Sequence, residues 1–97
     1  MITTTDLVGY CAAFLTTSAL FPQVVLTLRT RDTKSLSLMM YGFTALGVGL
    51  WLCYGILKGD AIIMTANSCT LIFALIILSV KIQNILTKKE FVQPTAP

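Results

Sequence analysis

The sequence contains three uncharged, mainly apolar runs that are each long enough to cross a lipid bilayer as a helix. They cover residues 7–28, 36–57 and 61–80. A helix of about 20 residues is about 30 Å long, which matches the hydrocarbon thickness of a membrane. Because 56% of the 97 residues are hydrophobic and only 11% are charged, a soluble domain of this size would expose large apolar patches. We therefore predict an all-α membrane protein with one domain, residues 1–97, in which three transmembrane helices precede a disordered tail, 87–97.

The basic residues gather on one side of the predicted bundle. The first connection and the segment after the third run carry Arg29, Arg31, Lys34, Lys81, Lys88 and Lys89. Since cytoplasmic loops are enriched in Lys and Arg, this predicts an outer N-terminus and a cytoplasmic C-terminus. The net charge of +3 then marks orientation and does not predict a nucleic-acid partner. A cleaved signal peptide is the alternative for the first run, but residues 1–6 lack a basic residue.

The residues that support most enzyme chemistry are absent from the sequence or lie outside the runs. There is no histidine, and the acidic residues lie at or beyond the ends of the runs: Asp6, Asp32, Asp60 and Glu90. This predicts no catalytic residue, no metal site, no cofactor and no enzyme activity. A proton-coupled carrier usually needs an ionisable group inside the membrane, so a transporter of this sequence would work by facilitated diffusion.

Three residues interrupt the apolar runs at about the same distance from an end. Pro22, Trp51 and Asn67 each lie about six residues, or about 9 Å, inside the predicted membrane. Because a tight turn joins the last two runs, Trp51 and Asn67 should share one depth near the outer side. Each has another interpretation: Trp51 as an interfacial aromatic residue, Asn67 as a bond between helices, and Pro22 as a fixed kink.

Helical spacing places these residues on stripes of mixed polarity. On the second run the stripe is Met40, Thr44, Gly47, Trp51, Tyr54 and Lys58, with Phe43 on its flank. Ser18 shares a face with Pro22, and Asp60 one with Asn67. An amide for hydroxyl groups and an aromatic plate for C–H groups together suit a sugar ring or another small, uncharged polar solute. The alternatives are that the glycines near Gly47 mark close helix packing and that Lys58 and Asp60 form a solvated turn.

Three helices are too few to enclose a path for a solute. An odd number of spans and a strong charge bias orient every copy in the same way, so the simplest closed assembly is a parallel, two-fold homodimer. Both copies of Trp51 and Asn67 would then meet around the axis. A bend at Pro22 would let the lower part of the first helix swing and open the cytoplasmic side.

Three segments, "FPQ" (21–23), "GLWLCYGILKGD" (49–60) and "TANSCTL" (65–71), resemble the bacterial SemiSWEET sugar transporters, the half-size members of the SWEET and PQ-loop group. The resemblance covers about residues 7–82. It implies a three-helix protomer packed in the order 1-3-2 and a homodimer. It also implies that Trp51 and Asn67 bind the substrate and that Pro22 and Gln23 form a hinge.

The resemblance further implies two gates. The outer gate would comprise Tyr54, Lys58 and Asp60, and the inner gate Met40 and Phe43. Lysine lacks the planar fork of the arginine that often stands at Lys58, so this part of the pattern departs from the family. We expect Ser18, Thr44 and Gly47 to line the cavity.

The expected function is uniport of a mono- or disaccharide by alternating access in the bacterial inner membrane. The expected partners are a second copy of the chain, the sugar and membrane lipid. Two alternatives are an accessory membrane protein that does not transport, and a PQ-loop carrier of another small polar metabolite.

Overall fold

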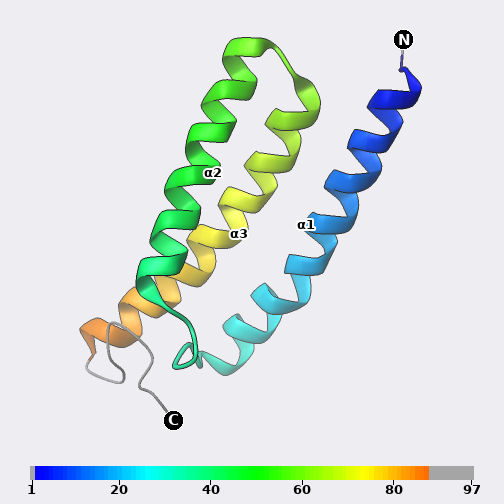
Figure 1. The fold of residues 1–97 in the computed structure, drawn as a ribbon. Coiled ribbons are helices and arrows are strands. Elements are labelled where there is room, and N and C mark those ends of the chain that lie inside the picture. The colour runs from blue at the N-terminus through cyan, green and yellow to red at the C-terminus, as the bar shows by residue number, and fades with distance from the viewer. Residues whose placement is uncertain (1, 88–97) are drawn as a thin grey trace.

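The computed structural model describes residues 2–87, and this part of the chain forms three long helices (Figure 1). They are α1 (Thr4–Thr30), α2 (Leu38–Lys58) and α3 (Ala61–Leu86). Each is long and apolar enough to cross a membrane. The chain is thus an all-α, multi-pass membrane protein. Residues 88–97 of the predicted disordered tail lie outside the described residues.

The helices pack in the order 1-3-2, as the resemblance implied. The middle helix, α3, packs against both α1 and α2, whereas α1 and α2 make no contact with each other within residues 2–87 (Figure 1). A short turn joins α2 to α3, so these two helices are antiparallel neighbours. A longer connection, residues 31–37, carries the chain from the end of α1 past α3 to α2.

Each helix begins at a polar side chain that caps its free backbone N–H groups. Thr3 and Asp6 form a reciprocal capping box on α1, Ser37 Oγ accepts from the Met40 amide, and Asp60 Oδ1 accepts from the Ile62 amide at 3.0 Å. Gly59 ends α2 in the left-handed region, at φ 70°, where glycine carries no steric penalty. The capping residues explain why α2 starts at Leu38 and α3 at Ala61.

The proline in α1 does not interrupt the helix, which continues from Thr4 to Thr30 as one element. Pro22 lacks the N–H that would bond to the Ser18 carbonyl. The helix therefore loses one backbone hydrogen bond at this point and keeps its turns on both sides.

The best-packed part of the protomer lies at one end. Apart from Gly55, the buried residues belong to the second half of α1, the first connection and the second half of α3: Val24, Thr27, Thr33, Ala74, Ile77, Val80, Lys81 and Asn84. The end of the apolar run at residue 80 does not end the helix. Lys81 lies within α3, which continues past the apolar run because helical hydrogen bonding does not require hydrophobic side chains.

Candidate functional site

A close approach at Gly55 fixes how α2 and α3 fit together. A Cβ atom added to Gly55 would lie 2.7 Å from Cγ2 of Ile63 and 3.2 Å from the backbone nitrogen of Met64. Trp51 is about one turn before Gly55 on α2, and Asn67 is about one turn after Ile63 on α3. Because the two helices are antiparallel, both residues lie about one turn below the same contact. The structure thus places Trp51 and Asn67 at a similar depth on neighbouring helices.

Trp51 lies in a shallow, mainly apolar hollow on α2. The hollow has a volume of about 500 Å³ and is lined by Gly47, Leu50, Trp51 and Tyr54. The Tyr54 ring packs edge-on against Trp51, with ring centroids 5.5 Å apart. The Trp51 side chain is 57% exposed in the protomer. The structure therefore brings together three residues predicted for the cavity, the substrate and the outer gate.

Asn67 is half-buried, and its amide bonds to its own helix. Nδ2 donates to the Ile63 carbonyl at 2.9 Å. An asparagine amide can donate two hydrogen bonds and accept two, so this bond fixes the side chain while using one N–H. On a helical wheel Asn67 falls between Ile63 and Met64, the two residues that meet Gly55. Its amide thus lies on the side of α3 that faces α2.

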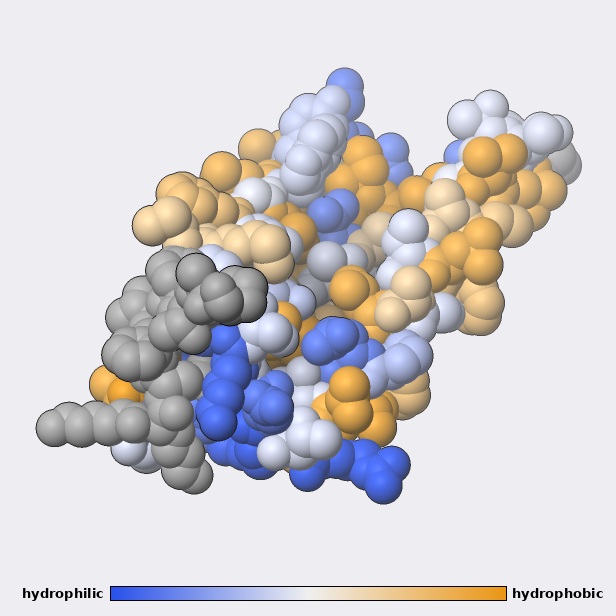
Figure 2. Space-filling model, turned by 60° about the horizontal axis from the view of Figure 1, so that its bottom comes forward, coloured by the Kyte–Doolittle hydropathy of each residue, from blue (hydrophilic) through white to orange (hydrophobic). Residues whose placement is uncertain are grey.

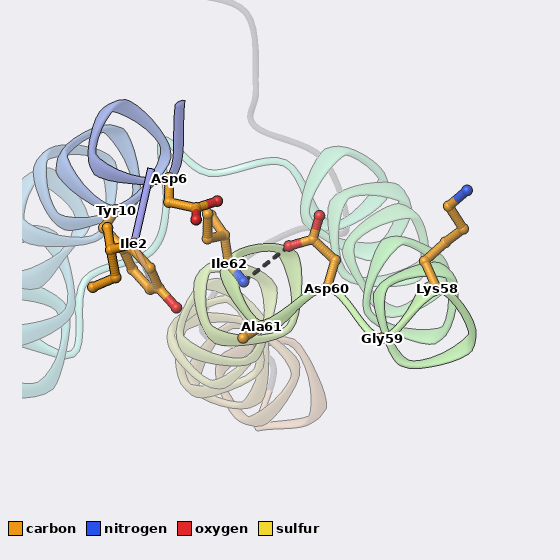
Figure 3. Close-up of a pocket in the computed structure, with 8 residues that line it drawn as sticks. All are labelled: Ile2, Asp6, Tyr10, Lys58, Gly59, Asp60, Ala61 and Ile62. Atoms are coloured by element: carbon orange, nitrogen blue, oxygen red, sulfur yellow. Dashed lines mark hydrogen bonds between the residues drawn. The ribbon is translucent and has the colours of Figure 1, made fainter. Parts of the chain in front are cut away.

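At the end where α2 turns into α3, Lys58 and Asp60 belong to a pocket of about 360 Å³ between α1 and the α2–α3 turn (Figure 3). Asp60 Oδ1 accepts from the Ile62 and Ile63 amides at 3.0 and 3.2 Å. The Lys58 side chain points away from this carboxylate (Figure 3). Asp60 is therefore the N-cap of α3, a role that the sequence interpretation missed although an acidic residue directly before an apolar run indicates it.

Ser18 is separated from the Trp51 hollow. It lines a second hollow of about 420 Å³ between α1 and α3, whose other residues are Tyr10, Ala13, Phe14, Thr17, Thr65, Ala66 and Cys69. Thr44 lies exposed on α2. The structure therefore does not unite Ser18, Thr44 and Gly47 around one hollow of the protomer.

The residues predicted for the inner gate and hinge lie in the other half of the protomer. Met40 and Phe43 are 54% and 68% exposed near the start of α2. Pro22 is exposed on α1, and Gln23 Nε2 donates to Oγ1 of the buried Thr27 at 3.5 Å. This bond links the predicted hinge to the part of α1 that packs tightly on α3.

The glycines of α2 divide into two kinds. Gly42, Gly47 and Gly49 have open space where a Cβ would be, whereas Gly55 abuts α3. Close packing within the protomer thus explains Gly55 and leaves the other three without an intramolecular neighbour. Residues 2–87 hold no group of three potential metal ligands, and the side chains that line the Trp51 hollow are uncharged.

Comparisons with known proteins agree with this architecture. Residues 5–88 match the MtN3_slv family, described as sugar efflux transporters for intercellular exchange. The sugar transporter SemiSWEET of Leptospira biflexa is 48% identical over 79% of this chain and 91% of its own length. That of Bradyrhizobium diazoefficiens is 42% identical over 79% of this chain and 90% of its own length.

A solved structure shares the fold closely. The crystal structure of SemiSWEET in the inward-open conformation superimposes with a TM-score of 0.81 at 40% identity, over 86% of this chain and 89% of that one. The family consists of transporters and not of enzymes. The chain belongs to the MtN3_slv family of sugar transporters.

Proposed function

We propose that the protein is a facilitative sugar transporter that works by alternating access as a homodimer. Trp51 and Asn67 of both protomers would bind the sugar at the dimer axis. The observation that carries this proposal is the shared depth of the two residues, which the Gly55 contact enforces. The indole would stack on the C–H face of the ring, and the amide would bind hydroxyl groups. Relatives named as sugar transporters support the substrate class.

The geometry of the Trp51 hollow supports a dimer. All four residues that line it belong to α2, so the protomer supplies one wall only. A site that binds a small polar molecule encloses most of its surface. A second copy in the same orientation would supply the opposite wall and would cover the open face at Gly47.

The gates would then form across the dimer axis. The Lys58 side chain points away from Asp60 of its own protomer (Figure 3), which leaves its ammonium group to pair with a carboxylate of the second copy. Asp60 would retain its capping bonds and use its second oxygen for the gate. Met40 and Phe43 would close the cytoplasmic side, with Pro22 and Gln23 as the hinge.

The orientation follows from the charges. Arg29, Arg31 and Lys34 are exposed at the end where α1 leads into α2, and hydrophilic side chains gather on this face (Figure 2). We place this end in the cytoplasm and the N-terminus outside, in the inner membrane of a bacterium.

Uptake into proteoliposomes tests the proposal. The purified protein should equilibrate a radiolabelled mono- or disaccharide, without an added ion gradient, faster than empty vesicles do. Trp51→Ala and Asn67→Ala should each abolish this flux while crosslinking still traps the dimer. Leu57→Ala is the matched control because Leu57 is on the same helix and 87% exposed; it should leave the flux unchanged.

Three outcomes would contradict the proposal in different ways. Normal flux in both site variants would contradict the assignment of Trp51 and Asn67 as the binding site. No flux with any sugar, together with a stable complex on pull-down, would favour an accessory membrane protein. Flux of another small polar metabolite that follows a pH gradient would favour a different carrier.

A further inference from the structure

A polar cluster with a buried centre, Thr33, Lys81 and Asn84, fastens the first connection to α3. Lys81 Nζ donates to the Thr33 carbonyl at 3.0 Å. Asn84 Nδ2 donates to the Arg31 carbonyl at 2.8 Å and to Thr33 Oγ1 at 2.9 Å. The Arg31 guanidinium bonds to Gln83 Oε1. We call these residues, Arg31, Thr33, Lys81, Gln83 and Asn84, the cytoplasmic latch.

Burial distinguishes the latch from an ordinary basic membrane boundary. Lysines near helix ends usually extend their ammonium groups to the headgroups and water. Lys81 is instead 1% exposed, and Thr33 is fully buried. A buried ammonium is costly unless protein acceptors bind it. The position of Lys81 thus reflects a specific attachment to the connection and not only the orientation of the chain.

The backbone of the connection is held in a conformation that needs support. Arg31 has φ 57°, the left-handed region that non-glycine residues seldom adopt. Its N–H bonds back to the Thr27 carbonyl at 2.8 Å, while its carbonyl accepts from Asn84. Thus the end of α1, the connection and the end of α3 are joined by bonds on both sides of this residue.

The latch divides α1 at the predicted hinge. The buried residues of α1, Val24 and Thr27, both lie within the turns that follow Pro22. On the other side of Pro22, α1 lies beside the hollow of about 420 Å³ that includes Thr17 and Ser18. One side of the hinge is therefore fixed to α3, and the other has space next to it.

We propose that Lys81 and Asn84 are positioning residues of the transport cycle. They make the inner segment of α1, the connection and the end of α3 move as one body, so that bending is confined to Pro22. Without the latch, the connection would deform in place of the hinge. Motion of the inner segment of α1 would then no longer be transmitted to its outer segment. This inference rests on the proposed transport function, but the latch itself is tested without transport.

Two measurements on full-length protein in proteoliposomes test the proposal. Hydrogen exchange of the amides of residues 31–36 reports whether the latch is closed, and the saturation curve for glucose or sucrose gives the turnover and the apparent KM. Lys81→Met should raise the exchange rates about tenfold or more. It should lower turnover several-fold and leave KM unchanged, because Trp51 and Asn67 are untouched. Lys81→Arg, which keeps a charged donor, should restore both values in part.

Control and second variants keep the proposal open to refutation. Lys34→Met removes the same charge from an exposed position beside Thr33 and should change neither measurement. Asn84→Leu removes the other donor and should reproduce the effect if Lys81→Met fails to fold. Raised exchange with normal turnover, or wild-type exchange in both variants, would overturn the proposal. If the wild type carries no sugar, the proposed function fails, while normal exchange in both Lys81→Met and Asn84→Leu would still refute the latch.

Discussion

The contact at Gly55 makes the sharpest prediction about the fold. In Gly55→Ala, the new methyl group would lie 2.7 Å from Ile63 Cγ2, 3.1 Å from Ile63 Cβ and 3.2 Å from the Met64 nitrogen. Rotation of the Ile63 side chain can move the first atom only. The other two belong to the framework of α3, so α2 and α3 must separate by several tenths of an ångström. Such overpacking costs about 1–3 kcal/mol.

The same substitution at other glycines serves as a control. Gly42→Ala meets no heavy atom within 4 Å, and alanine favours a helix over glycine by up to about 1 kcal/mol. Gly9→Ala is intermediate, because its nearest neighbours at 3.0 and 3.1 Å are the ends of the Ile62 side chain, which can move. Among the three variants, Gly42→Ala should therefore be the most stable, Gly9→Ala intermediate and Gly55→Ala the least stable.

Unfolding in mixed detergent micelles would measure these differences. The chain has a single tryptophan, Trp51, which is one turn from Gly55 and reports on the contact by fluorescence. In a double-mutant cycle, Ile63→Ala removes the nearest methyl group and should reduce the cost of Gly55→Ala by about 0.5–1 kcal/mol. Equal stability of Gly55→Ala and Gly42→Ala, or strict additivity in the cycle, would refute the packing argument.

Three further predictions concern the helix ends, the proline and the driving force. Asp60→Ala should destabilise the fold by about 1 kcal/mol through loss of the N-cap, whereas Asp60→Asn should keep the cap and the stability. Slower sugar flux in Asp60→Asn would therefore report the loss of the gate charge and not a loss of stability. Pro22→Ala should raise the unfolding midpoint by restoring the bond to the Ser18 carbonyl and should slow sugar exchange; exchange at the normal rate would exclude the hinge. A pH gradient should not change sugar flux in vesicles, because the chain has no histidine and its acidic residues lie outside the apolar runs.

The three helices could be predicted because hydrophobicity determines them almost alone, whereas their packing order, 1-3-2, was predicted only from the resemblance to the SemiSWEET transporters. The depth of Trp51 and Asn67 also followed from counting residues away from one tight turn. Some ends of the helices were less accurate: α2 begins at Leu38, after the Ser37 cap, and α3 continues to Leu86, past the end of the apolar run. The hydrophobic pattern alone shows neither of these ends, although a polar residue directly before an apolar run can indicate a cap.

Contacts between residues far apart in the sequence could not be predicted. Lys81 and Thr33 are 48 positions apart, and a lysine at the end of an apolar run usually indicates only the cytoplasmic side. Likewise, glycines on α2 look alike in the sequence, yet only Gly55 meets α3, while Gly42, Gly47 and Gly49 face open space. Telling Gly55 from the other glycines requires knowing where α2 crosses α3, and a local sequence pattern does not give that position.

The uneven burial of the protomer connects these observations. Its buried polar and apolar residues concentrate at the latch end, while Trp51 and Phe43 on α2 are 57% and 68% exposed. Lipid alone could cover those side chains, but lipid gains nothing from the hollow at Gly47 and Trp51, which α2 lines by itself. A second protomer would fill this hollow. In such a dimer, α3 and the latch would hold each protomer together, and the exposed face of α2 would change its contacts as the pathway opens and closes.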